Sequence, residues 1–392
     1  MKATEIKLGC EVLVDKVPSW LRSERLGLLV NQASVDHSFE SVSTLVRKAG
    51  GRLTCLFSPQ HGLFAEKQAN MIESSDGWDA SSSVPIFSLY GRVRRPTPEM
   101  LGLIDVLVID LQDVGTRVYT YGATVGLCIE AASRSGVKVV VLDRPNPIGG
   151  VNVEGNVLRE DHRSFVGLYC IPMRHGLTLG ELARYMAAKC ELPCDLEVVP
   201  VRGWKRSRLF PETRLPWVFP SPNMPSWETA LLYPGMVLLE GTNVSEGRGT
   251  TLPFQIFGAP FIDQHRLGEY LAGAKLEGVA FRPVCFEPTF DKWKGEACFG
   301  FQIHITDHRK IMPYRLGLTL LQGLLNLHGD RFCWLSPPYE YEWSKLPIDI
   351  LLGDGALRRE LEAGKDMKAM ETGWSKGLEE YRNDREDCLI YE

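Results

Sequence analysis

Short apolar runs alternate with amphipathic segments through the first part of the chain. Segments 38–51 and 119–136 carry apolar residues at helical spacing, and the first of them ends in Gly50-Gly51, which is a helix stop signal. Between and around them lie short runs rich in Val, Ile and Leu, which predict buried strands at 25–32, 52–58, 84–91, 104–112 and 137–143. Strands buried on both faces and joined by helices are typical of a parallel sheet. We therefore expect an α/β fold.

The pattern changes after a proline-rich stretch at residues 215–235. Before it, Thr178 and Glu181 form a capping-box pattern that opens a helix over 175–190, and a strand is expected over 195–204. After it, an alternating strand at 299–307 and a helical segment at 314–329 indicate a smaller α+β domain. We expect one domain over residues 1–228 and a second over 229–392.

Polar side chains gather where three of the predicted strands end. Ligands of open parallel sheets bind beyond the carboxyl ends of the strands, and topology would bring these side chains to one rim although they lie far apart in the sequence. They are Gln60 and His61 after the second strand, Asp110, Asp113 and Arg117 after the fourth, and Asp143, Arg144 and Asn146 after the fifth.

Two segments hold the densest polar clusters. "SPQHGLFAEKQANM" (58–71) follows a strand, and "LLEGTNVSEGRGTTLPFQIFGAP" (238–260) is rich in glycine. A solvated loop and a plain glycine-rich turn are the alternatives to ligand binding. With tyrosines such as Tyr119 nearby, a rim of acids, amides and arginines is suited to a sugar, which has polar edges and apolar faces. Glycoside cleavage needs carboxyl groups, and the candidates are Glu66, Asp110, Asp113 and Glu246, with His61 assisting one of them.

Composition and net charge argue against several classes of binding partner. The net charge of −5 gives no basic footprint of the kind that nucleic-acid binders carry. No secretory signal and no apolar run of about 18 residues is present, so we expect a cytoplasmic protein without a membrane span. Phosphate-binding glycine motifs, a G-x-S-x-G elbow and zinc-site spacings are missing, so we expect no cofactor and no metal. The oligomeric state stays open.

Many long motifs, in order, resemble those of the DUF1343 family, also called the NamZ exo-β-N-acetylmuramidases. They include "SPQHGLF", "DVLVIDLQDVGTRVYTY", "VVLDRPNPIGG", "PMRHGLTLGELA", "PSPNMPSWETALLYPG" and "LLEGTNVSEGRGTTLPF". The resemblance runs from about residue 20 onwards. It implies a Rossmann-like first domain, a smaller second domain, a cleft between them, and release of N-acetylmuramic acid from the non-reducing ends of peptidoglycan fragments.

The chain departs from the family at one position that matters. Active members typically carry Pro-Glu-His-Gly where this chain has Pro59-Gln60-His61-Gly62, and an amide cannot transfer protons at neutral pH. Three interpretations stay open: Glu66 takes over as the acid, the chain cleaves a related glycoside by a rearranged mechanism, or it binds sugar without cleaving it.

The implied substrate suggests further roles. An Asp at 110 or 113 would orient the acetamido group if that group attacks the anomeric carbon, and the lactyl carboxylate suits a bidentate arginine. The substrate-binding candidates are Gln60, Asp110, Arg117, Tyr119, Asn146, Arg174, Asn243 and Arg248. Structural roles are the alternatives: a turn cap for Asp110, an ion pair with Asp113 for Arg117, and core packing for Tyr119.

Overall fold

A seven-stranded sheet forms the centre of the first half of the chain. The computed structural model describes residues 6–68 and 71–392. The strands run in the order β3-β4-β2-β1-β5-β6-β9, and every neighbouring pair is parallel except β3 with β4. Their bounds are β1 Arg25–Val30, β2 Arg52–Ser58, β3 Gly77–Asp79, β4 Val84–Ser88, β5 Val106–Asp110, β6 Lys138–Leu142 and β9 Leu196–Val199. The predicted α/β fold with a parallel sheet is confirmed, whereas the antiparallel edge strand β3 was not predicted.

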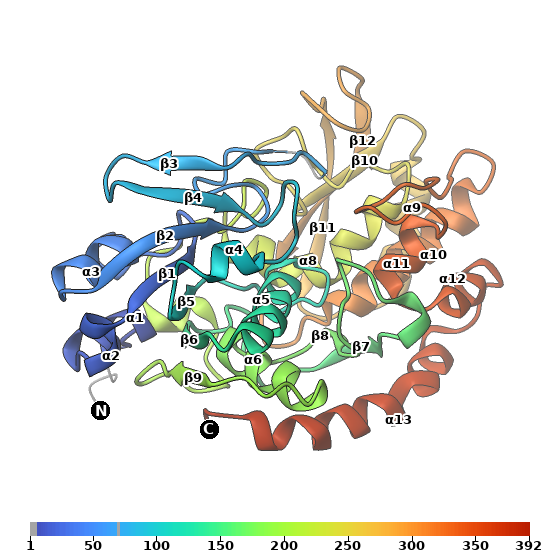
Figure 1. Cartoon of the computed structure of the whole chain (residues 1–392). Coiled ribbons are helices and arrows are strands. Elements are labelled where there is room, and N and C mark those ends of the chain that lie inside the picture. Colours follow the sequence, from blue (N-terminus) through green and yellow to red (C-terminus); the bar gives the residue numbers. More distant parts are fainter. Residues whose placement is uncertain (1–5, 69–70) are drawn as a thin grey trace.

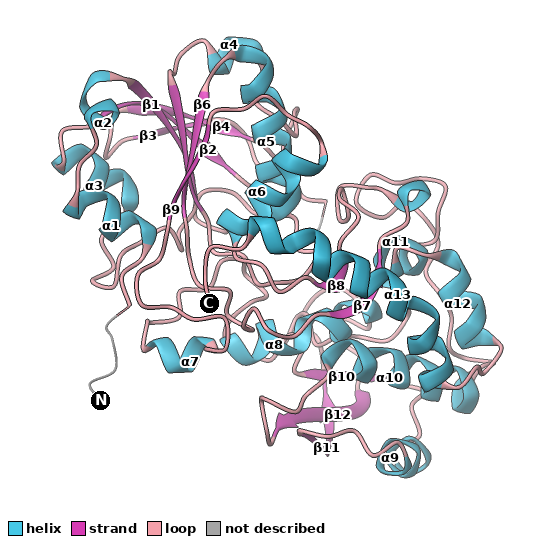
Figure 2. Cartoon of the chain, turned by 90° about the horizontal axis from the view of Figure 1, so that it is seen from below, coloured by secondary structure: helices cyan, strands magenta, loops and turns pink. Residues whose placement is uncertain are grey.

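Helices cover both faces of this sheet (Figures 1 and 2), with α1 to α3 on one face and α4 to α6 on the other. Their bounds are α1 Gly9–Asp15, α2 Ser19–Ser23, α3 Val42–Lys48, α4 Pro98–Leu101, α5 Tyr121–Ser135 and α6 Leu179–Lys189. Helix α3 begins later than the pattern predicts because the Ser41 side chain caps it by accepting the Thr44 N–H. The capping box predicted for α6 is present, with Thr178 and Glu181 each accepting the other's backbone N–H.

The second half of the chain contributes a small antiparallel sheet and a group of helices. Strands β10 Ile256–Ala259, β12 Cys298–Ile305 and β11 Val279–Phe286 pair in that order. The helices are α7 Phe210–Thr213, α8 Trp227–Met236, α9 Gln264–Gly273, α10 Pro313–His328, α11 Pro347–Leu352, α12 Gly355–Glu362 and α13 Met367–Arg385, with 3-10 turns η2 Val237–Gly241 and η3 Glu386–Cys388. A further 3-10 turn, η1 Glu160–His162, lies earlier in the chain, between β6 and α6. A two-stranded ribbon, β7 Glu154–Val157 with β8 Pro172–Arg174, also comes from the first half of the chain, between β6 and α6. The α+β character expected for this half is confirmed.

The sheet has a topological switch between β1 and β5. The chain runs from β1 to β2 and β4 on one side, and then returns to place β5, β6 and β9 on the other side of β1. Loops leaving the strand ends at such a switch diverge and open a crevice. The segments after β2 and β5 therefore lie where a ligand site is expected.

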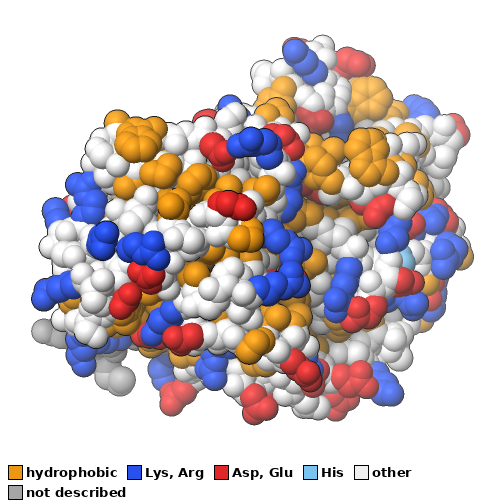
Figure 3. Space-filling model, in the orientation of Figure 1, with side chains coloured by type: hydrophobic (Ala, Val, Ile, Leu, Met, Phe, Trp, Pro, Cys, Tyr) orange, Lys and Arg blue, Asp and Glu red, His pale blue; other side chains and the backbone are white. Residues whose placement is uncertain are grey.

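Basic and acidic side chains are interspersed over the face of the molecule seen in Figure 3. Across residues 6–68 and 71–392, no helix combines the length and the apolar character that crossing a membrane requires.

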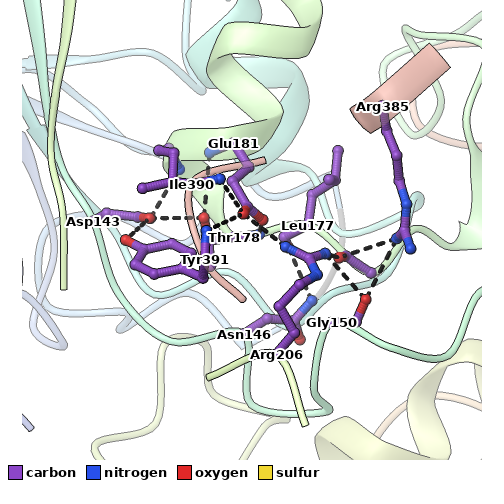
Figure 4. A network of polar contacts seen from close by, with 12 residues as sticks. Asp143, Asn146, Gly150, Leu177, Thr178, Glu181, Arg206, Arg385, Ile390 and Tyr391 are labelled. Carbon is purple, nitrogen blue, oxygen red and sulfur yellow. Dashed lines mark hydrogen bonds and ion pairs between the residues drawn. The ribbon is translucent and has the colours of Figure 1, made fainter. Parts of the chain in front are cut away.

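Segment 386–392 returns from α13 to the first half of the chain and docks against the end of β6 (Figures 1 and 4). Tyr391 donates its hydroxyl proton to Asp143 at 2.5 Å, and Thr178 donates to the same carboxylate at 2.7 Å. Glu181 accepts the Ile390 N–H at 2.9 Å and forms an ion pair with Arg206 at 2.7 Å. The segment therefore ties α13 to the parallel sheet through buried polar groups.

Tyr391→Phe should lower the stability of the fold more at pH 8 than at pH 5. Burial raises the pKa of Asp143 to about 6, against the donors Tyr391 and Thr178. Because this folded-state pKa lies above the unfolded value, the contribution of Asp143 is fully present below the unfolded pKa and is lost as pH rises through about 6. Without the Tyr391 hydroxyl, the ionised carboxylate of Asp143 lacks one donor, and the free energy of unfolding at pH 8 should fall by about 1–3 kcal/mol.

Urea unfolding of both chains at the two pH values measures this difference. Tyr270→Phe is the matched control, because the Tyr270 hydroxyl donates to the amide oxygen of Gln322 at 3.4 Å and not to a carboxylate. A loss for Tyr391→Phe that is equal at pH 5 and pH 8 would show that the hydroxyl does not act on Asp143.

Candidate active site

One narrow cavity draws its walls from both halves of the chain. The segment after β2 and the segment after β5 supply one wall, and η2, the glycine-rich loop after it and the pair Tyr339 and Glu340 supply the other. The polar lining residues are Gln60, His61, Thr120, Ser221, Asn223, Glu240, Arg248 and Glu340, and the aromatic ones are Tyr119, Tyr121, Tyr233, Phe254 and Tyr339. Polar groups that converge among aromatic rings are the usual lining of a small-molecule site.

His61 presents a neutral imidazole to this cavity. Its Nδ1 lies 2.6 Å from the Lys67 carbonyl, so Nδ1 carries the proton and Nε2 is left as an acceptor. Burial, together with the nearby charge of Arg248, lowers the pKa of His61 to about 4. The backbone of His61 has a φ of 73°, a strained value for a non-glycine residue that is common at functional sites. His61 therefore suits hydrogen bonding to a substrate hydroxyl or a water.

The amide of Gln60 is held at both ends. Thr120 donates its hydroxyl proton to Gln60 Oε1 at 2.5 Å, and Gln60 Nε2 donates to Glu340 Oε1 at 3.2 Å. Tyr90 donates to the other oxygen of Glu340 at 2.7 Å. The side chain at position 60 is thus linked directly to a carboxyl group from the far end of the chain.

Glu240 is the second carboxyl group on the cavity wall. It forms an ion pair with Arg248 at 2.6 Å, and Tyr339 donates its hydroxyl proton to the other carboxylate oxygen at 2.6 Å. Arg248 also lies 3.1 Å from Glu246, which faces Lys292 at 2.7 Å on its other side. Two carboxyl groups, one paired with a guanidinium and one paired with neutral donors, therefore face the same space.

Four of the candidate residues line this cavity, namely Gln60, His61, Tyr119 and Arg248. Glu66 lies on the loop that follows His61, but it is exposed and accepts the N–H of Phe64 at 3.3 Å. Glu66 is not among the residues that line the cavity.

The candidate aspartates serve other neighbours. Asp110 is fully buried and pairs with Arg144, which lines a separate cavity beside Trp217. Asp113 accepts the Gly115 N–H at 2.6 Å and lies 3.5 Å from His175. These contacts fix the turns after β5 and β6, and neither aspartate is among the residues that line the cavity shared by the two halves.

The remaining candidates hold parts of the backbone together. Arg117 is buried and donates to the carbonyls of Asn156, Ile171, Leu351 and Leu352. Arg174 donates to the Ile148 carbonyl and also pairs with the Glu154 side chain, Asn146 donates to the Leu177 carbonyl, and Asn243 donates to the Arg331 carbonyl. For Glu246, Lys292 and Arg248 outweigh the effect of burial and lower the pKa.

Sequence reasoning missed Glu240, Glu340 and Tyr339 as candidates. Glu240 belongs to the same glycine-rich segment as Glu246, and the pattern does not say which of the two faces the cavity. Glu340 lies in "PPYEYEW" (337–343), and no spacing rule connects that segment with Gln60.

Within the part of the chain that the structure describes, one group of side chains has metal-ligand chemistry. Oxygen and nitrogen atoms of Glu11, Asp36 and His37 come within 4.8 Å of one another. Glu11 accepts the Leu8 N–H at 2.7 Å, and Asp36 accepts the N–H groups of Ser38 and Glu40, both at 2.8 Å. These bonds give the carboxylates a local role at the start of α1 and in the turn before α3.

Comparison with known proteins agrees with this architecture. The family model described as "Exo-beta-N-acetylmuramidase NamZ, N-terminal" matches residues 26–228, and the model for its C-terminal part matches residues 231–391. The peptidoglycan β-N-acetylmuramidase NamZ of Bacillus subtilis (strain 168) is 41% identical over 391 residues, which is 100% of this chain and 92% of that protein.

Two crystal structures of DUF1343 family proteins from Bacteroides fragilis NCTC 9343 are also similar. One has a TM-score of 0.89 at 34% identity and the other a TM-score of 0.78 at 27% identity, and each comparison covers 99% of both chains. The two family models together match residues 26–228 and 231–391, and the two crystal structures have the same fold. The chain belongs to the NamZ exo-β-N-acetylmuramidase family, DUF1343.

Proposed function

We propose that this chain is a glycoside hydrolase that releases N-acetylmuramic acid-type sugars from the non-reducing ends of peptidoglycan fragments. The observation that carries the proposal is the cavity in which Glu240 and Glu340 face the space beside His61. Glycosidases generally cleave through two carboxyl groups that flank the scissile bond. The choice of sugar is supported by the Bacillus subtilis relative, which is named a peptidoglycan β-N-acetylmuramidase and is 41% identical in sequence.

The lining of the cavity suits a sugar ring. Tyr233 and Phe254 meet edge to face with ring centroids 4.9 Å apart, and Tyr119 meets Tyr233 at 6.0 Å. Such rings contact the apolar faces of a pyranose, while Asn223, Arg248 and other polar groups hydrogen-bond its edges. Walls from both halves of the chain enclose the space, which favours a chain end over the middle of a glycan.

Glu240 and Glu340 divide the chemistry in this proposal. An oxocarbenium-like transition state places positive charge on the anomeric carbon, and a carboxylate beside it lowers its energy. Glu240, which is paired with Arg248 and Tyr339, is placed to supply that charge. A bidentate arginine suits the lactyl carboxylate, and among the candidates Arg117, Arg174 and Arg248 the one that lines the cavity is Arg248.

Gln60 favours a second candidate function, a protein that binds cell-wall sugars or a related glycoside without muramidase turnover. The family resemblance implies a glutamate at this position, and an amide cannot replace its proton. A binder would keep the aromatic and polar lining of the cavity and would lose the reaction.

The two functions separate in one experiment. The chain is incubated with 4-nitrophenyl β-N-acetylmuramide and with the matching β-N-acetylglucosaminide, and release of nitrophenol is measured. In parallel, the melting temperature of the protein is measured with and without the free sugars. A hydrolase releases nitrophenol from the muramide. A rise in melting temperature with N-acetylmuramic acid, without release from either glycoside, would support the binder and would contradict the hydrolase.

A further inference from the structure

Glu340 lies on a strained turn that carries it into the cavity. Glu340 and Tyr341 have φ values of 45° and 67°, which are unfavourable for residues with side chains. The Glu340 side chain is nevertheless buried, with 3% of the residue exposed. A turn that holds a carboxyl group in this conformation must be fixed by its surroundings.

A stack of rings and one guanidinium fixes this turn. The guanidinium of Arg94 lies 4.3 Å from the ring centre of Tyr90 and 4.3 Å from that of Tyr341. Tyr90 also donates its hydroxyl proton to Glu340, so the loop after β4 is joined to the turn by stacking and by a hydrogen bond. Glu340 is thereby held from two sides, by Tyr90 and by Gln60.

We propose that Glu340 is the general acid that protonates the leaving glycosidic oxygen, and that Gln60 is a positioning residue for it. This inference rests on the proposed function. In the reaction, the C1–O bond breaks, its electron pair leaves with the oxygen, and that oxygen takes the carboxyl proton of Glu340. Water then adds its hydroxyl group to C1, and the remaining proton of that water returns to the enzyme and restores its protonation state.

The surroundings of the two carboxyl groups separate their roles. Burial, and next the charge of Glu240, raise the pKa of Glu340 against the hydrogen bonds from Tyr90 and Gln60. A carboxyl group that keeps its proton closer to neutral pH is what an acid catalyst requires. Glu240, by contrast, is paired with the guanidinium of Arg248.

The amide at position 60 supports this assignment. Because Thr120 donates to Gln60 Oε1, the NH2 group of Gln60 points at Glu340 and stabilises the carboxylate left after proton transfer. A glutamate in the same place would put two carboxyl groups side by side, and they would share protons. In this chain Glu340 is the titrating member of the pair.

Glu340→Gln tests the proposal through the leaving group. The variant should lose about 100-fold or more in kcat/KM on a β-linked N-acetylmuramic acid disaccharide, whose leaving oxygen needs a proton. With a 2,4-dinitrophenyl leaving group, which departs without protonation, the loss should be less than about 10-fold. Glu342→Gln is the matched control on the same turn, since Glu342 is bonded to Ser344 outside the cavity, and it should behave like the unmodified chain.

A second variant keeps the test informative if Glu340→Gln folds poorly. Tyr90→Phe removes a donor to the Glu340 carboxylate, so the alkaline limb of the pH profile of kcat/KM should move to higher pH. Equal losses on both leaving groups for Glu340→Gln, or an unmoved alkaline limb for Tyr90→Phe, would overturn the role of Glu340. Absence of release by the unmodified chain from both substrates would instead overturn the proposed function itself.

Discussion

Replacing Glu240 with glutamine should lower kcat on an N-acetylmuramide by about 1,000-fold or more while the chain stays folded. The substitution removes the negative charge that faces the developing positive charge of the sugar. Arg248 loses one partner but keeps Glu246 at 3.1 Å, so the guanidinium is not left alone. Kinetics with the chromogenic muramide and urea unfolding of the same preparation measure the two effects separately.

Glu246→Gln is the informative comparison, because the sequence analysis named Glu246 as a catalytic candidate and did not name Glu240. Glu246 pairs with Lys292 at 2.7 Å and is not among the residues that line the cavity. Breaking this buried pair should lower the free energy of unfolding by about 3 kcal/mol and leave kcat per folded molecule largely intact. If Glu246→Gln abolished turnover at unchanged stability while Glu240→Gln remained active, the roles given to the two residues would have to be exchanged.

The fold was predictable because its signals are local. A strand such as β5, with the sequence Val-Leu-Val-Ile-Asp, is buried along its whole length, and its composition shows that directly. The capping box of α6 spans four consecutive residues, so it too can be found in the sequence. The edge strand β3 has only three residues and its burial is slight, so no pattern marks it.

Only one wall of the candidate site was predictable from the sequence. Gln60 and His61 follow a strand that the pattern identifies, and topology places such residues at the rim. Glu340 is 280 residues away from its partner Gln60, and only the packing of the second half brings the two together. The sequence around either residue does not predict this contact.

Buried polar residues also resemble site residues in a sequence. Asp110 ends β5, Arg117 lies between this strand and the cavity segment, and both residue types are common in sugar sites. In the structure, Arg117 satisfies four backbone carbonyls and Asp110 pairs with Arg144. Buried backbone carbonyls and buried charges require polar partners, and so does a bound ligand. The sequence alone does not show which of these a polar side chain serves.

Gly235→Ala should lower the free energy of unfolding by about 3 kcal/mol or more. Helices α8 and α10 cross with their backbones in contact: a methyl group on Gly235 would lie 1.8 Å from the Pro313 carbonyl oxygen, and one on Gly317 would lie 2.4 Å from the Gly235 carbonyl oxygen. These atoms belong to the backbone, so relief requires the two helices to separate. Helix α8 leads directly into η2, which carries Glu240, and separation should therefore also reduce sugar release.

Gly373→Ala is the matched control for this substitution. Gly373 lies inside α13, and a methyl group there would meet no atom within 4 Å. Because alanine favours a helix over glycine, this variant should be unchanged or more stable by up to about 1 kcal/mol. Urea unfolding compares both variants with the unmodified chain. Equal stability of Gly235→Ala and the unmodified chain would mean that α8 and α10 do not pack backbone to backbone, and the placement of Glu240 in the same cavity as His61 would then lose its structural basis.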